Sequence, residues 1–229
     1  GFYTYLLPAT ISARIPLKIA NAVSERMLTL QAEPLAALAM ALGRPYPTPQ
    51  IDRAWSYILD CHTHDAIAGC APDSVTEDVM FRLRQARDLA DVVMDRSMQH
   101  ITKNLDLSDS PEDGVHMVAF NPLPFARGGT VQAEVAFPAD ADAKGLRLVD
   151  AAGKEVPFQL IASEKESLFV DSIWDVPKIA SLQKFTVVAR IEDVPALGYT
   201  TLRAEPLTNR SRTYGSLSPE TNVLENEFV

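Results

Sequence analysis

The feature that most constrains this chain is a change, midway along it, in the spacing of its apolar residues. In the first part they recur at intervals of three and four, as at Val75 and Val79, which is the period of a helix with one buried face. After the acidic loop at 108–114, short β-prone segments follow one another without a helical pattern between them. We therefore expect an α+β chain, with a three-helix bundle over 1–110 and an antiparallel, β-sandwich-like domain over 111–229.

Three helices are predicted in the first part. The first covers 12–42, with Ser12 as its N-cap, and Pro34 should kink or break it because proline removes a backbone donor. A second, shorter helix runs from about residue 51 to 59. The third begins at an apparent capping box, Ser74-Val75-Thr76-Glu77, in which side chains satisfy the free amides of the first turn. These helices should pack against one another, since a long amphipathic helix is not stable alone.

Seven strands are predicted in the second part, separated by turns rich in Gly and Pro. Their expected ranges are 115–119, 130–137, 145–149, 156–162, 168–176, 185–191 and 200–204. The predicted turns cover 127–129, 151–154 and 195–198. We expect Phe158, Phe169 and Trp174 in the sandwich core, because no clustered aromatic face suggests a sugar-binding platform. A structural role is therefore predicted for this domain.

Composition excludes some classes of partner. The formal net charge of −9 argues against a nucleic acid or an anionic membrane surface, because neutralising phosphates requires a basic patch. No apolar run is long enough to span a bilayer. The two cysteines, Cys61 and Cys70, could close a small loop, but so few cysteines favour a reduced, cytoplasmic protein.

A polar segment, His62 to Gly69, interrupts the helical pattern where an apolar segment would be expected. It can be a helix corner whose histidines bind free carbonyls. It can also be a self-contained zinc site made by Cys61, His62, His64 and Cys70, although that spacing matches no standard finger. The third alternative is a partial metal site, in which one histidine completes a ligand set supplied from elsewhere.

Five short motifs favour the third alternative. They are the run His64-Asp65-Ala66-Ile67-Ala68-Gly69-Cys70, the segment from Ser12 to Asn21, Ala32-Glu33-Pro34-Leu35 followed by Trp55, Asn121-Pro122-Leu123-Pro124, and Leu224-Glu225-Asn226-Glu227-Phe228. In their order along the chain, these motifs resemble segments of the family 38 glycoside hydrolases, the retaining α-mannosidases. The resemblance spans nearly the whole chain, from the middle helices to the start of the large β region.

The resemblance implies a function for two neighbouring residues. His64 would be a ligand of Zn²⁺, and Asp65 would accept hydrogen bonds from hydroxyls of a bound mannoside or oligosaccharide. No catalytic residue is expected in this chain, because in that family a preceding α/β domain supplies the nucleophile, the acid/base and the other metal ligands. We therefore expect an inactive piece of a retaining α-mannosidase that needs this domain as a partner. The alternative is a non-catalytic carbohydrate-binding or scaffolding module.

Other polar residues near the motif have less specific predictions. We expect a structural role for His62, and packing roles for both cysteines. Gly69 should permit a tight turn. Arg14 could reach a substrate channel or form an ion pair with Glu33 or Glu25.

Overall fold

The computed structural model describes residues 8–107, 114–170, 176–210 and 222. It divides into two compact units. The helical unit comprises Gly1–Asp106 with Pro122–Pro124, and the β unit comprises Leu107–Asn121 with Phe125–Val229. Each unit has its own hydrophobic core, and the two are described separately.

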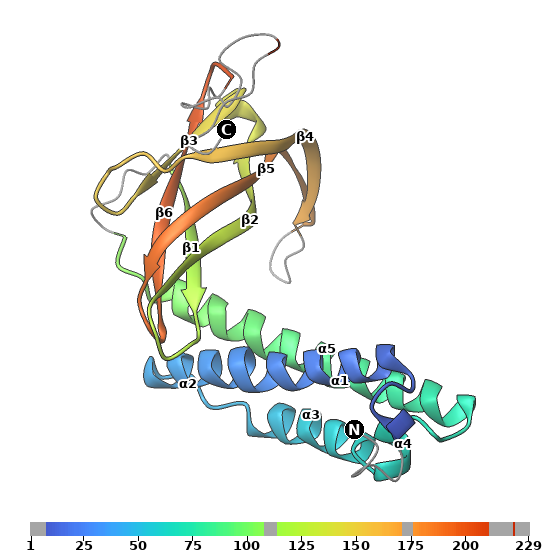
Figure 1. The fold of residues 1–229 in the computed structure, drawn as a ribbon. Helices are drawn as coiled ribbons and strands as arrows, with labels where there is room; N and C mark the ends of the chain where they lie inside the picture. The colour runs from blue at the N-terminus through green and yellow to red at the C-terminus, as the bar shows by residue number, and fades with distance from the viewer. Residues whose placement is uncertain (1–7, 108–113, 171–175, 211–221, 223–229) are drawn as a thin grey trace. The chain divides into compact units, whose positions relative to one another are not determined.

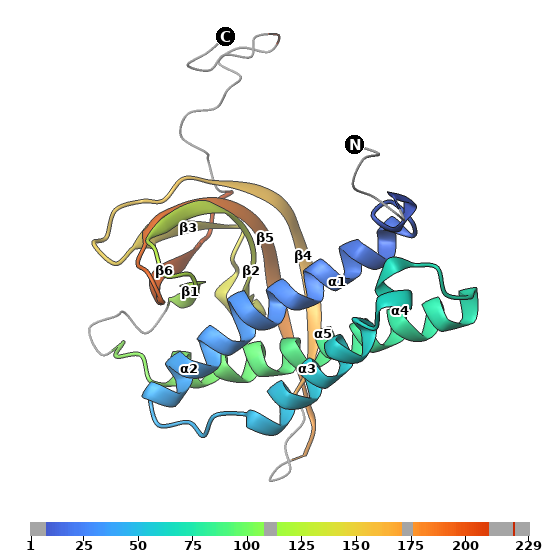
Figure 2. The same cartoon turned by 60° about the horizontal axis from the view of Figure 1, so that its bottom comes forward.

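The helical unit is built along its longest helix. Its elements are η1 (Pro8–Thr10), α1 (Ile15–Met27), η2 (Leu28–Ala32), α2 (Glu33–Ala41), α3 (Thr48–Cys61), α4 (His64–Ala68) and α5 (Asp73–Lys103). Helices α1 and α2 follow one another along α5, α3 also packs on α5, and the short α4 lies where α5 begins (Figures 1 and 2). Leu17, Ile58 and Leu83 come from three different helices and are almost completely buried in the shared core. The predicted three-helix bundle is therefore confirmed, with α4 as an addition.

Pro34 interrupts the first long helix, as predicted. The turn before it, η2, is a π-helix, and Pro34 occupies the first turn of α2. Pro34 has no amide hydrogen to donate, and the amide of Glu33 just before it bonds the Leu28 carbonyl across the π-turn. The wider π-turn lets the chain continue in the same direction.

Both predicted helix caps are wrong. Helix α1 begins at Ile15, and its N-cap is Arg14 in a left-handed conformation, while the Ser12 hydroxyl lies 3.4 Å from the Ala9 carbonyl. Helix α5 begins at Asp73 after Pro72 and has no side-chain cap. Its Thr76 hydroxyl and amide both donate to the Pro72 carbonyl. The capping box fails because the helix starts earlier than its sequence signature implies.

The β unit consists of two three-stranded antiparallel sheets. Its strands are β1 (Val115–Asn121), β2 (Arg127–Pro138), β3 (Gly145–Asp150), β4 (Phe158–Val170), β5 (Lys178–Val194) and β6 (Gly198–Leu207). One sheet has the order β1-β6-β3 and the other β2-β5-β4 (Figure 1). Leu148 and Ala204 from the first sheet share a core with Val135 and Phe185 from the second. The predicted α+β class with a sandwich-like second part is confirmed.

Three details of the β prediction are wrong. Residues 158–162 and 168–170, predicted to lie in separate strands, belong to one long strand, β4, while 171–175 lie outside the described residues. Residues 127–129 begin β2 instead of forming a turn. Phe169 is 63% exposed, so it is not a core residue.

Other predictions for the β unit fit the structure. Phe158 packs against the core, and the turns at 151–154 and 195–197 join strands as expected. Trp174 and the motif at 224–228 lie outside the described residues. Within the part of the chain that is described, no helix combines the length and the apolar content that crossing a lipid bilayer requires.

Candidate functional site

The polar segment predicted as a turn contains a short helix. Helix α3 ends at Cys61, and α4 covers His64–Ala68. The Thr63 carbonyl accepts hydrogen bonds from the amides of Ala66 and Ile67. Gly69 ends α4 in a left-handed conformation with φ 83°, which glycine adopts without steric cost.

His64 and Asp65 occupy the first turn of α4 and face solvent. Their side chains are 95% and 70% exposed, and His64 Nε2 lies 3.2 Å from Asp65 Oδ1. The exposed Cys70 thiol approaches the same carboxylate, with Sγ 3.4 Å from Oδ1. An imidazole and a carboxylate are thus side by side on an accessible surface, where a metal ion or a sugar hydroxyl could reach them.

His62, two residues earlier, is held by α1 instead. Its Nε2 lies 2.8 Å from Asn21 Oδ1 and 3.3 Å from Glu25 Oε1. Both partners are acceptors, so Nε2 must carry the proton. This arrangement supports a structural role for His62.

The four candidate ligands of a self-contained zinc site do not converge. The Cys61 thiol is buried and donates to the Val79 carbonyl, while Cys70 is exposed and both thiols are free. Burial raises the pKa of Cys61 above its ordinary value, which disfavours the thiolate that a metal requires. Among the described residues, no group of three or more His, Cys, Asp or Glu side chains could hold a metal ion. The packing prediction holds for Cys61 but not for Cys70, and the metal-ligand role of His64 stays a prediction.

Arg14 contacts neither of its predicted partners. Its Nε lies 3.0 Å from the Gly69 carbonyl, and its Nη2 lies 3.0 Å from the Ala71 carbonyl and 2.8 Å from Asp73 Oδ1. Lys18 Nζ lies 2.9 Å from the Ala68 carbonyl. No contact was predicted for Lys18, although it follows Arg14 by four residues.

Glu33 and Asp73 are also accounted for. Glu33 accepts a hydrogen bond of 2.8 Å from the Trp55 indole, which joins α2 to α3. Asp73 stands at the start of α5, and its carboxylate pairs with Arg14.

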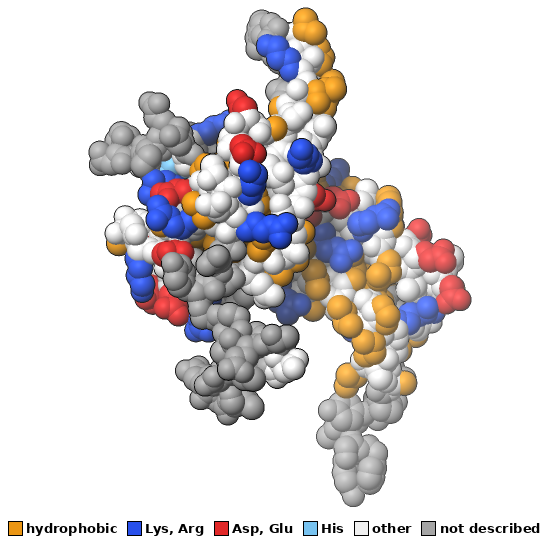
Figure 3. Space-filling view, turned by 90° about the horizontal axis from the view of Figure 1, so that it is seen from above, with side chains coloured by type: hydrophobic (Ala, Val, Ile, Leu, Met, Phe, Trp, Pro, Cys, Tyr) orange, Lys and Arg blue, Asp and Glu red, His pale blue; other side chains and the backbone are white. Residues whose placement is uncertain are grey.

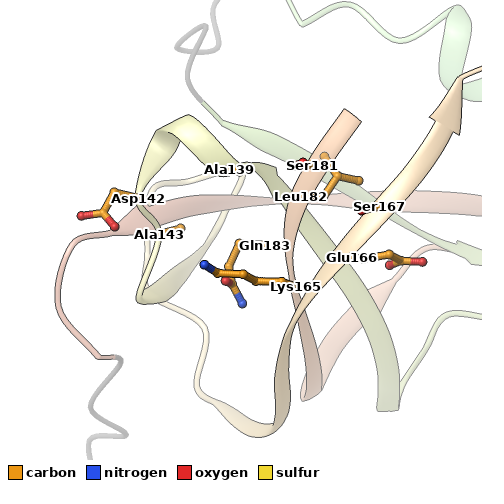
Figure 4. A pocket seen from close by; sticks show the side chains of 9 residues that line it. All are labelled: Ala139, Asp142, Ala143, Lys165, Glu166, Ser167, Ser181, Leu182 and Gln183. Carbon is orange, nitrogen blue, oxygen red and sulfur yellow. The ribbon is translucent and has the colours of Figure 1, made fainter. Parts of the chain in front are cut away.

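The β unit has a polar pocket of about 340 Å³ between β4, β5 and the loop after β2 (Figure 4). Asp142, Lys165, Glu166 and Gln183 line it. The Gln183 amide already donates to the Ser163 hydroxyl and the Glu164 carbonyl. On the face shown in Figure 3, basic and acidic side chains are interspersed instead of being separated by sign. Neither feature forms a cluster with evident chemistry, so the α4 corner is the better candidate site.

Comparisons with known proteins agree with the resemblance seen in the sequence. Residues 8–101 match the family described as alpha mannosidase middle domain. A protein of Halalkalibacterium halodurans described as a "Putative mannosylglycerate hydrolase" is 27% identical over 111 residues, which cover 48% of this chain and 12% of that protein.

Two solved structures from Enterococcus faecalis are similar over nearly the whole chain. One is an alpha-mannosidase of strain V583, with a TM-score of 0.79, 26% identity, and coverage of 97% of this chain and 27% of that one. The other is a protein in the glycosyl hydrolase family 38, with a TM-score of 0.77, 26% identity, and coverage of 96% and 28%. The chain therefore spans little more than a quarter of these structures, and less of the curated relative.

Proposed function

We propose that this chain, which resembles the family 38 glycoside hydrolases over nearly its length, is part of a zinc-dependent retaining α-mannosidase. The observation that carries the proposal is the pair His64 and Asp65, exposed side by side on α4. The pair lies within the segment that matches the alpha mannosidase middle domain. The structural neighbours extend the likeness into the β unit.

His64 and Asp65 have different roles in this proposal. The neutral imidazole of His64 would be one ligand of Zn²⁺. The ionised Asp65 would accept hydrogen bonds from two neighbouring sugar hydroxyls, which orients the ring for cleavage. When bound, the metal would supply charge stabilisation for the sugar diol. Neither residue would be the nucleophile or the acid/base. Both of those groups would come from a catalytic α/β domain of the same polypeptide.

The surface next to the site supports a partner domain. Ile11, Ile15 and Ile19 are 64%, 46% and 58% exposed; Ile15 and Ile19 lie one helical turn apart at the start of α1, and Ile11 lies in the turn before it. A row of exposed isoleucines is typical of a surface that another part of a protein covers.

We also propose a cytoplasmic location for the parent enzyme, which the two free cysteines support.

The parent enzyme provides the test. The substrates are 4-nitrophenyl α-mannoside and, because of the name of the curated relative, mannosylglycerate. We expect hydrolysis with retention of the anomeric configuration, which a chelator abolishes and added zinc restores. Replacing His64→Ala should lower kcat/KM by at least about 100-fold, since even residues that only support a ligand contribute about 10- to 100-fold.

The matched control is His100→Ala. His100 Nε2 lies 3.1 Å from the Leu42 carbonyl. Because His100 is in the last turn of α5 and α4 lies where α5 begins, this variant should keep its activity. The 229-residue chain alone should show no turnover. Binding of mannosides without cleavage by the parent would favour a carbohydrate-binding module, and hydrolysis unaffected by His64→Ala would contradict the assigned role.

A further inference from the structure

Four polar side chains of the α1 segment form a stripe along one face. They are Arg14, the left-handed N-cap of α1, and Lys18, Asn21 and Glu25, whose spacings of three and four place side chains on the same side of a helix. Each of them contacts the short stretch from residue 62 to 73. That stretch contains α4, so these four side chains all contact the segment that carries the candidate site.

The first half of the stripe binds the C-terminal end of α4. Arg14 donates to the carbonyls of Gly69 and Ala71, and Lys18 donates to the carbonyl of Ala68. The last carbonyls of a helix have no partner within it, and both cations are half-buried here. Lys18 thus satisfies the last carbonyl of α4, and Arg14 satisfies two carbonyls of the segment that directly follows it.

The backbone at this contact is built for close approach. A Cβ on Gly69 would lie 3.1 Å from Lys18 Nζ and 3.3 Å from both the Ala13 carbonyl oxygen and Arg14 Cβ. Arg14 itself has φ 50°, a left-handed conformation that a residue with a side chain rarely adopts. Its side chain is held by the carbonyls of Gly69 and Ala71, which follow α4.

The second half of the stripe holds the N-terminal side of α4. Asn21 is buried, and Asn21 Oδ1 and Glu25 Oε1 both accept from His62 Nε2. His62 directly precedes Thr63, whose carbonyl receives the first hydrogen bonds of α4. Helix α4 is thus fixed at both ends to the same face of α1, with His64 and Asp65 between the two anchors.

We propose that Arg14, Lys18 and Asn21 are positioning residues, which fix α4 so that His64 and Asp65 present their side chains in one defined orientation. A helix of five residues is not stable alone, so its geometry must come from contacts with the rest of the unit, which are these hydrogen bonds and the packing of Ala66 in the core. The role in orienting a metal ligand rests on the proposed function. The anchoring of α4 does not, and it is measurable without activity.

Amide hydrogen exchange by NMR on the 229-residue chain tests the anchoring. In Lys18→Met, the amides of Ala66, Ile67 and Gly69 should exchange at least about 10-fold faster, because α4 opens locally. The amide of Leu83 in the middle of α5 should be unchanged.

Two control variants separate anchoring from charge. Lys103→Met removes an exposed lysine from the last turn of α5, and Asp73→Asn removes the exposed carboxylate that pairs with Arg14. An exposed ion pair contributes little, so both should leave the exchange of α4 near that of the unchanged chain. Exchange in Lys18→Met equal to that of these controls would overturn the proposal.

The ring of His62 gives a second, independent measurement. Its ¹⁵N shifts should show a protonated Nε2, and Asn21→Leu should alter them because it removes one acceptor oxygen. Identical ring shifts in Asn21→Leu and the unchanged chain would refute the second anchor. An effect on exchange together with an inactive parent would overturn the mannosidase function and keep the anchoring.

Discussion

The α4 corner and the outer face of the β2-β5-β4 sheet both contain several charged groups, but they hold them in opposite ways. In the sheet, Lys184 Nζ lies 3.0 Å from Glu166 Oε2, 3.1 Å from Glu164 Oε1 and 3.8 Å from Glu134 Oε1, and its side chain is 17% exposed. At the corner, Arg14 and Lys18 bind mainly backbone carbonyls. In the sheet, Lys184 therefore pairs with carboxylates, whereas at the corner Arg14 and Lys18 bind mainly backbone carbonyl oxygens.

This difference shows why charge density alone does not identify a site. Glu134, Lys184 and Glu164 come from three adjacent strands, so their attraction ties the sheet together across its register. The carboxylate of Asp65 receives no cation from α1, and it remains exposed next to His64. A satisfied cluster is structural, whereas an exposed pair on a fixed segment is free to bind a ligand.

The largest expected effect contrasts the exposed corner with the packed interior next to it. Iodoacetamide should modify Cys70 readily, and Cys61 more slowly by on the order of 1,000-fold or more, because a buried thiol reacts only when its surroundings open. The raised pKa of Cys61, caused by burial, adds to its protection. Mass spectrometry of the two peptides over time measures both rates.

Denaturant supplies the control for this labelling experiment. In the unfolded chain the two cysteines should react at similar rates. Rapid labelling of Cys61 in the native chain would mean that the end of α3 is not packed as described.

The next effect separates the proposed ligand group from the structural cluster. In the parent enzyme, Asp65→Asn should lower kcat/KM by about 10- to 100-fold, since a hydrogen bond to a charged group contributes about 1.5–3 kcal/mol. Lys184→Met should change it by less than about 3-fold, because substitutions away from a site act mainly on stability. Steady-state kinetics measures both. A loss of activity in Lys184→Met as large as that in Asp65→Asn would remove the distinction between the two regions.

The sequence predicted the features that depend on local periodicity. The helical unit, the irregularity before Pro34 and most strands of the β unit follow from the spacing of apolar residues and from proline and glycine. His64 and Asp65 came from a family resemblance, and their roles stay predictions. Helix α4 was not foreseen, because five residues are too few to show a helical period.

The errors share a physical cause, which is that long-range contacts leave little local signal. Arg14 could be assigned an acidic partner from its charge, but its main acceptors are carbonyls more than fifty residues away. Strand β4 seemed to break in its polar middle at 163–167, yet β5 pairs with it throughout that stretch. Phe169 lies near the end of the same strand, where the sheet has no core to cover it.

The smallest expected effect is a pH dependence of stability that only the sheet cluster should show. The hydrogen bonds that Lys184 donates to Glu166 and Glu164 raise its pKa above the ordinary value of 10.5. A raised lysine pKa means that the folded chain holds the proton more tightly, so the stabilisation is complete below pH 10.5 and is lost as pH rises through the folded pKa. Urea unfolding should give a constant difference between the unchanged chain and Lys184→Met from pH 7 to about 10, which narrows at higher pH. Lys165→Met, which removes an exposed lysine from β4, should show a smaller difference without this narrowing, and a gap for Lys184→Met that widens above pH 10.5 would contradict the pairing.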